Sequence, residues 1–199
     1  MPAGDSDLPI ISFASAKRLD EWLAAQPTTS KGIWLKLAKK DTGIASVSQS
    51  EAIECALCHG WIDGQGKKFD EQYWLLRFTP RKRRSLWSEK NRTKAIELIG
   101  QGRMTAAGLA EIERAKTDGR WDAAYAPQST ATVPDDLQQA LDGNPAAHEM
   151  FSRLDSTNRY AILHRVHTAK QAKTRASRIE KYVSMLARGE TIYPVKIKP

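Results

Sequence analysis

The segment Ala126-Pro-Gln-Ser-Thr-Ala-Thr-Val-Pro134 divides the 199-residue sequence into two parts of different composition. It carries no charge and contains two prolines, which is typical of a surface linker. All six tryptophans precede residue 122, and residues 1–149 carry 20 basic and 20 acidic side chains. Residues 150–199 carry 11 basic and 3 acidic side chains, so the net charge of +8 arises in the last quarter of the chain. We therefore predict an aromatic-rich body over 1–125, a linker over 126–134 and a basic module over 135–199.

The overall composition excludes several classes of protein. With 41% apolar and 27% charged residues, the chain is neither disordered nor collagen-like. No apolar run approaches the roughly 18–20 residues of a membrane helix, so we expect no membrane span. Residues 1–12 are acidic and contain two prolines, unlike the basic and apolar regions of a secretory signal. The sequence alone therefore favours a cytoplasmic location.

Hydrophobic periodicity and capping residues predict an α+β fold. In the body, helices are expected over 16–26, 48–59, 88–99 and 105–116, and strands over 33–39, 68–69 and 73–79. Ser48 and Glu51 form a capping-box pattern at the start of the second helix. The fold class is thus a small mixed α/β body with a short antiparallel sheet, followed by an all-helical basic C-terminal module.

The C-terminal module is predicted to contain four helices, over 135–141, 145–154, 156–169 and 173–188. In the last of these, an apolar stripe is formed by Ile179, Tyr182, Val183 and Leu186. Three basic residues, Arg175, Arg178 and Lys181, share its flank, so we expect their charges to be displayed together.

The string Cys55-Ala-Leu-Cys58-His59 matches patterns for haem attachment and for dithiol redox chemistry. Its position at the end of the predicted helix disfavours a thiolate, because the helix dipole is negative there. A Cys₂His₂ zinc site with His164 and His167 would need two distant segments to meet. We expect both cysteines to be small buried apolar side chains, and we expect no metal and no cofactor.

Three glycines in the segment Gly60-Trp-Ile-Asp-Gly-Gln-Gly66 indicate a tight bend rather than a regular strand. A thiol, an imidazole and a carboxylate at Cys58, His59 and Asp63 are the parts of a nucleophilic site, but Cys58 and His59 point about 100° apart on a helix. A binding loop with Asp63 as acceptor and Trp61 as an apolar wall is the alternative, and a purely structural turn stays open.

Residues 77–94 form a basic run interleaved with aromatic residues. The run contains eight basic side chains and one acidic residue; Phe78 and Trp87 lie within it, and Trp74 lies just before it. Guanidinium groups beside aromatic rings suit phosphate and base contacts, although a solvated basic face has the same composition. Motifs of sequence-specific nucleic-acid readers and nucleotide-binding loops are absent from the sequence.

Several of these strings together resemble the YdeI/OmpD-associated family, named for bacteriocin protection. The matching strings are Gly32-Ile-Trp34, Gly60-Trp-Ile-Asp63, Phe78-Thr-Pro-Arg-Lys82, Ser85-Leu-Trp-Ser88 with Asn91, Gly102-Arg-Met104, Gly119-Arg-Trp-Asp122, Ala169-Lys170, and Thr174-Arg175 with Arg178-Ile179. The resemblance spans about residues 10–190. It implies an α+β body, a helical C-terminal module and a role in tolerance of antimicrobial peptides or in envelope stress, without an established reaction.

Three functional hypotheses follow. The first is a non-catalytic protective protein that binds an anionic or aromatic partner. Its surface is expected to consist of Trp61, Asp63, Arg81, Lys82, Trp87, Asn91 and Arg175. The second is an enzyme that acts on an anionic small molecule through Asp63 and Cys58. The third is a nonspecific nucleic-acid binder.

Overall fold

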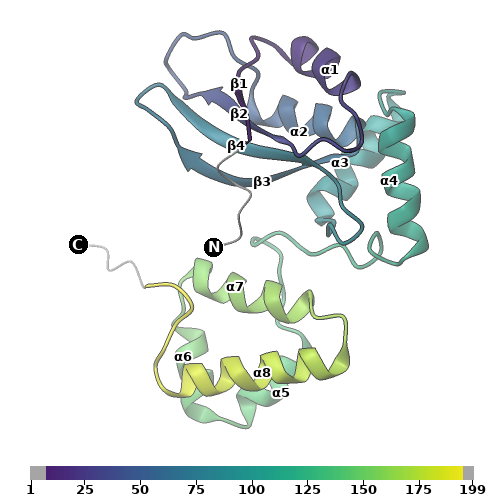
Figure 1. Ribbon diagram of the computed structural model, residues 1–199. Helices are drawn as coiled ribbons and strands as arrows, with labels where there is room; N and C mark the ends of the chain where they lie inside the picture. Colours follow the sequence, from purple (N-terminus) through teal and green to yellow (C-terminus); the bar gives the residue numbers. More distant parts are fainter. Residues whose placement is uncertain (1–7, 195–199) are drawn as a thin grey trace. The chain divides into compact units, whose positions relative to one another are not determined.

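The computed structural model of the chain describes residues 8–194. The chain forms two compact units, and the boundary between them in the sequence falls between Ala124 and Tyr125. The predicted α+β class is confirmed, because the N-terminal unit holds a four-stranded mixed sheet and the C-terminal unit is helical (Figure 1).

The sheet of the N-terminal unit has the order β1-β2-β4-β3. Its strands are β1 (Ile10–Ile11), β2 (Ile33–Ala38), β3 (Trp61–Lys68) and β4 (Tyr73–Pro80). The short β1 pairs parallel to β2, whereas β2 and β3 both pair antiparallel to the central β4. The long antiparallel part of the sheet therefore comes from β2, β3 and β4, and the parallel β1 makes it mixed.

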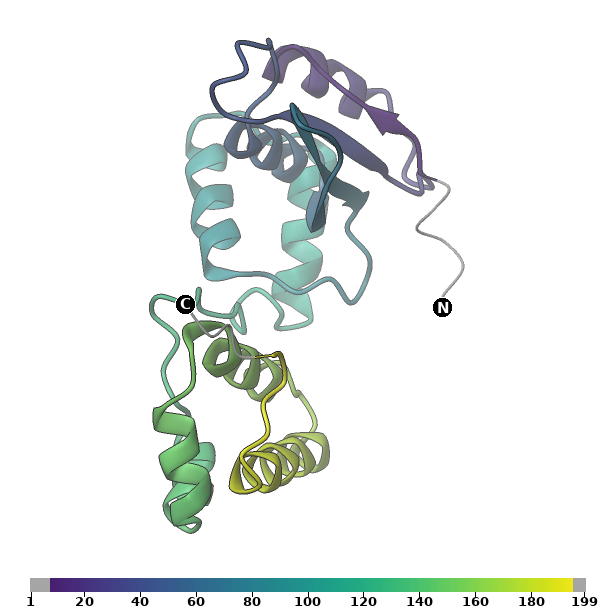
Figure 2. The same cartoon turned by 90° about the vertical axis from the view of Figure 1, so that its left-hand side faces the viewer.

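Two helices, α1 (Ala16–Ala24) and α2 (Gln49–Cys58), cover one face of this sheet (Figure 1, Figure 2). Alternate residues of β2, namely Ile33, Leu35 and Leu37, point into the core that these helices close. The predicted capping box is confirmed at the start of α2: the Ser48 side chain accepts from the Glu51 amide, and the Glu51 carboxylate accepts from the Ser48 amide.

The other side of α2 packs against α3 (Glu89–Gly100) and α4 (Ala106–Thr117) in a second apolar core. The approach of α4 to α2 is close, because a Cβ atom on Gly108 would lie 2.3 Å from the Cys58 carbonyl oxygen. The Thr105 hydroxyl donates a hydrogen bond to the same oxygen at 2.7 Å. The end of α2 is thus held between the sheet and α4.

The predicted tight bend over residues 60–66 is wrong, since this segment forms the first part of β3. Gly60 takes a positive φ of 74°, but from Trp61 onward the chain pairs with β4. The glycines accompany a register shift between Asp63 and Gly66. A bulge of this kind needs one extra residue in a strand, and small residues accommodate it.

The C-terminal unit contains α5 (Asp135–Asp142), α6 (Pro145–Ser152), α7 (Ser156–His167) and α8 (Ala172–Ala187) (Figure 1). Together they enclose one apolar core. The predicted stripe on the last helix is part of this core: Ile179, Tyr182 and Leu186 are buried, and Val183 is partly buried. The four helices therefore share a core of their own.

Candidate functional site

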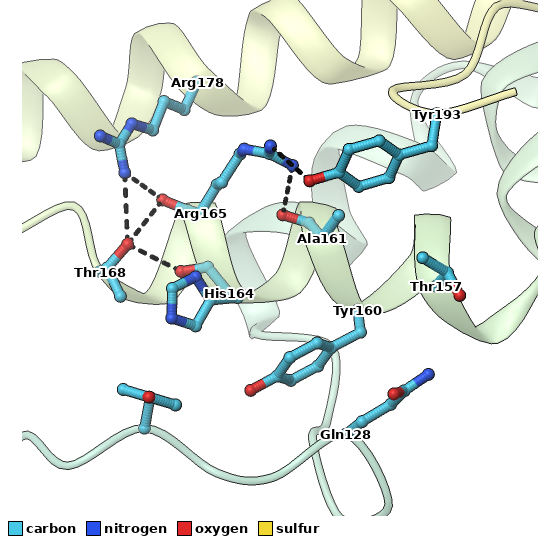
Figure 3. Close-up of a pocket in the computed structure, with 10 residues that line it drawn as sticks. Gln128, Thr157, Tyr160, Ala161, His164, Arg165, Thr168, Arg178 and Tyr193 are labelled. Atoms are coloured by element: carbon cyan, nitrogen blue, oxygen red, sulfur yellow. Dashed lines mark hydrogen bonds between the residues drawn. The ribbon is translucent and has the colours of Figure 1, made fainter. Parts of the chain in front are cut away.

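The C-terminal unit contains a cavity of about 570 Å³ beside α7. Aromatic, basic and small polar side chains line it, and none of the lining residues is acidic. These residues are Tyr125, Gln128, Thr157, Tyr160, Ala161, His164, Arg165, Thr168, Arg178 and Tyr193 (Figure 3). Its volume lies within the range that small-molecule sites occupy.

Helix α7 supplies most of the cavity wall. Tyr160, Ala161, His164, Arg165 and Thr168 recur at the spacing of one helical turn, so they lie on the same side of the helix. The helix is fixed at its start by Asp155, whose carboxylate accepts from the Asn158 amide at 2.7 Å. The cavity is therefore built on a regular element rather than on a loop.

The C-terminal end of α7 is closed by side chains that also face the cavity. The last carbonyl groups of a helix have no partner within it. Thr168 donates its hydroxyl to the His164 carbonyl oxygen at 2.8 Å, and Nη1 of Arg178 donates to the carbonyl oxygen of Arg165 (Figure 3). Within residues 8–194, Nε and Nη2 of Arg178 have no hydrogen-bond acceptor, so they remain free to donate to a ligand.

His164 lies among aromatic rings in this cavity. Its imidazole meets the Tyr125 ring edge to face, with 4.7 Å between the centroids, and the Tyr160 ring at 5.8 Å. Burial lowers the pKa of His164, and the positive charges of His167, Arg165 and Arg178 lower it further. The lining holds two arginines and no acidic residue, an arrangement in which a negative charge would be favourable.

Arg165 of α7 contacts Tyr193, which follows α8 in the sequence. Nη2 of Arg165 lies 3.2 Å from the Tyr193 hydroxyl and donates to it, and the guanidinium lies 5.6 Å from the centre of the same ring. Nη1 donates to the Ala161 carbonyl oxygen at 3.3 Å. These contacts restrain the guanidinium, which is a suitable donor group for a carboxylate or phosphate.

The surface predicted around Trp61 and Trp87 is not open to solvent. Trp61 is 4% exposed and belongs to the core between the sheet and its helices, and Trp87 is 2% exposed in the core of α2, α3 and α4. Both indoles are therefore largely enclosed, although Trp61 also lines a cavity within the N-terminal unit. Each indole ring contributes a large apolar surface to one of the two cores that α2 contacts, and burying that surface is more favourable than exposing it.

The other predicted residues of the N-terminal unit occupy different environments. Arg81 is 5% exposed: its guanidinium stacks on Trp87 at 3.6 Å and donates to the Leu86 carbonyl oxygen at 3.2 Å. Lys82 is exposed, whereas Asp63 and Asn91 are half-buried. The buried Arg81 thus supports the core around Trp87.

Arg175, the predicted site residue of the C-terminal unit, connects three helices. Its Nε and Nη2 donate to the Asp136 carboxylate of α5 at 2.6 and 2.8 Å, and its Nη1 donates to the Val166 carbonyl oxygen of α7 at 2.9 Å. The hydrogen bonds from Arg175 hold the pKa of Asp136 below its ordinary value. This bonding gives Arg175 a structural role, because it joins α8 to α5 and α7.

The prediction for the cysteines is confirmed. Cys55 and Cys58 are both free thiols and both 3% exposed. Burial raises the pKa of Cys55 to about 12 and also raises the pKa of Cys58. A thiolate is disfavoured at either position, which removes the physical basis for a nucleophilic Cys58.

Sequence analysis missed most of the cavity residues. For His164 the sequence offers a zinc ligand or a partly exposed helix flank, and it does not single out Tyr125, Tyr160, Arg165 or Tyr193. The one-turn spacing of Tyr160, His164 and Thr168 is a signal that could have grouped them on one face. Nothing in the sequence links that face to Tyr193.

Comparison with known families divides the chain in the same region as its composition does. Residues 11–111, just over half of the 199, match a domain of unknown function, DUF8412. The chain belongs to this family. Residues 130–189 match a second family, described as bacteriocin-protection, YdeI or OmpD-associated. That match confirms the resemblance for the C-terminal module of this DUF8412 protein, whereas its N-terminal unit is matched by the other family.

The other two comparisons found no similar protein. Searches of curated proteins and of solved structures each found no match to the chain. Within residues 8–194, no helix is both long enough and apolar enough to cross a membrane. Function must therefore be argued from the site itself.

Proposed function

We propose that this protein is a non-catalytic binding protein of the bacteriocin-protection type, and that the cavity beside α7 receives an anionic group carried on an aromatic ring. The observation that supports this most is the combination of Arg165, Arg178 and His164 with aromatic neighbours and without an acidic residue in the lining. An anion there would meet hydrogen-bond donors and positive charges at the same place.

The aromatic part of the ligand follows from the tyrosines. Tyr125 and Tyr160 flank the His164 imidazole, and a planar ring can stack against these faces or meet their edges. The Tyr160 hydroxyl already donates to the Ala126 carbonyl oxygen at 3.0 Å, which restrains its ring. Such a restrained aromatic wall needs little ordering when a ligand binds.

The charge of the cavity also limits the ways in which the protein could protect a cell against cationic peptides. A basic cavity does not attract a cationic peptide, so protection would act through an anionic intermediary, such as a phosphorylated or carboxylated aromatic compound. The cytoplasmic location predicted from the sequence is part of this proposal.

Isothermal titration of the full chain with phenyl phosphate tests the proposal. Arg165→Gln is expected to weaken binding about tenfold, which corresponds to the roughly 1.4 kcal/mol of one charge-assisted hydrogen bond. Arg153→Gln is the matched control, because Arg153 is 73% exposed and lies outside the cavity lining. Affinity for inorganic phosphate should be lower, since it lacks the ring. Equal affinities of the two variants for phenyl phosphate would contradict the proposal.

A further inference from the structure

A second cavity of about 570 Å³ lies within the N-terminal unit. It is bounded by the end of α1 and the loop after it, the junction of α2 and β3, the end of β4 and the first turns of α4. Much of its wall is apolar and includes Leu23, Pro27, Trp61, Pro80, Ala107 and Ala110. Polar side chains also line it, namely Gln26, Thr28, His59, Arg81, Thr105, Glu111 and Arg114.

His59 lines this cavity and is held by Asp20. Its side chain is 8% exposed, and Nε2 lies 2.9 Å from Oδ1 of Asp20. A carboxylate only accepts hydrogen bonds, so Nε2 of His59 carries a proton, and in the neutral form of the ring the lone pair is on Nδ1. No donor within residues 8–194 bonds to Nδ1. The Asp20 carboxylate thereby fixes the tautomer in which His59 accepts from a ligand.

Arg114 presents donors to the same cavity. Its Nη2 is paired with the Glu111 carboxylate, while Nε and Nη1 have no acceptor within the described residues. Glu111 lies against Gly60, the residue after His59, because a Cβ atom on Gly60 would lie 2.9 Å from Cγ of Glu111. Burial raises the pKa of Glu111 in spite of the nearby Arg114 and Arg81, so its own charge is weakly solvated. Arg114 and His59 thus line the same cavity.

We propose that this cavity binds a small hydroxy acid with an apolar or aromatic body. The carboxylate of the ligand accepts from Arg114, its hydroxyl group donates to Nδ1 of His59, and its body packs against Trp61 and Leu23. This arrangement satisfies a donor and an acceptor that the described protein leaves open, and it buries the apolar part of the ligand against apolar walls. The site is separate from the cavity beside α7 and involves no residue of that cavity.

Titration of the ¹⁵N-labelled full chain with a matched set of small aromatic compounds tests the inference. Benzoate carries the carboxylate alone, the three hydroxybenzoate isomers add the hydroxyl group, and 4-hydroxybenzylamine replaces the carboxylate by a cation. At millimolar concentrations, we expect at least one hydroxybenzoate to shift the Gly60 and Ala107 amide signals with a higher affinity than benzoate. The amine should leave these signals unchanged.

Four variants assign the contacts. Arg114→Gln should weaken hydroxybenzoate binding about tenfold, whereas Lys116→Gln, which removes the same charge from the same helix outside the lining, should not. Glu111→Gln should strengthen binding, because it removes a competing negative charge. His59→Gln should lower the affinity for hydroxybenzoate to that for benzoate.

Three results would overturn this inference. They are the absence of shifts at Gly60 and Ala107 with every carboxylate, equal effects of Arg114→Gln and Lys116→Gln, and equal binding of the amine. Amide spectra of each variant report whether the N-terminal unit is folded, so that a failure to fold is recognised. If His59→Gln or Glu111→Gln unfolds the unit, the binding of benzoate, hydroxybenzoate and amine to the unaltered chain still tests whether the cavity binds a hydroxy acid.

Discussion

Arg175 of α8 and Asp136 of α5 are joined by two hydrogen bonds of 2.6 and 2.8 Å. The third donor of this guanidinium reaches the Val166 carbonyl oxygen of α7 at 2.9 Å. One side chain therefore connects three of the four helices of the C-terminal unit. Because the cavity beside α7 depends on the position of that helix, Arg175 supports the site without lining it.

Replacement of Arg175 by glutamine is expected to destabilise the C-terminal unit by about 1–2 kcal/mol, because it removes a bidentate pair and a bond to a helix-terminal carbonyl. Urea unfolding, followed through amide signals of α5 and α7, measures this loss. Arg153→Gln is the control: Arg153 and Glu149 are both 73% exposed, and loss of such a pair should cost no more than about 0.5 kcal/mol. Equal losses for the two variants would argue against the structural role of Arg175.

This contribution should depend on pH in the acidic range. The pKa of Asp136 is lowered in the folded state, chiefly by the hydrogen bonds from Arg175. Its stabilising effect is therefore present above the ordinary aspartate pKa of about 3.9 and is lost as the pH falls through the lower folded value. In Arg175→Gln this part of the acid dependence should be absent.

The two cysteines are expected to be unreactive in the folded protein. Both are 3% exposed, and burial raises the pKa of each, that of Cys55 to about 12. A disulfide thiol reagent should modify neither residue near neutral pH, and it should modify both in concentrated guanidinium chloride. Rapid modification of Cys58 in the folded chain would restore a nucleophilic interpretation.

Trp87 is expected to contribute to stability rather than to binding. It is 2% exposed, it meets Trp121 with 4.8 Å between ring centroids, and Arg81 stacks on it. Truncation to alanine should cost about 3–5 kcal/mol, as for other buried large aromatic residues. Lys82→Ala, a change at an exposed position, should stay within about 0.5 kcal/mol. Thermal unfolding of the N-terminal unit distinguishes these values, and similar effects of both changes would contradict the packing described for Trp87.

Local signals predicted the elements of the fold well. The Ser48 capping box and the apolar stripe of Ile179, Tyr182 and Leu186 depend on residues within one or two helical turns of each other. The segment 60–66 was less predictable, because a glycine-rich string suits both a bend and a bulged strand, and the pairing of β3 with β4 decides between them.

The candidate site was much harder to predict. Burial of Trp61 and Trp87 depends on the packing of two layers against α2, which the sequence does not display. Likewise Arg175 was grouped with exposed charges, because its partner Asp136 lies 39 residues away in the sequence. The cavity beside α7 brings together residues as distant as Tyr125 and Tyr193, and only the tertiary fold makes them neighbours.

The most direct test of anion binding beside α7 is an NMR titration of the His164 imidazole, with and without phenyl phosphate. In the free protein, its pKa should lie below the ordinary histidine value of about 6.5, because the ring is buried among positive charges. A bound anion favours the charged imidazole, so saturation with phenyl phosphate should raise this pKa, and phosphate alone should raise it less. An unchanged His164 pKa at saturating phenyl phosphate would contradict the proposed site.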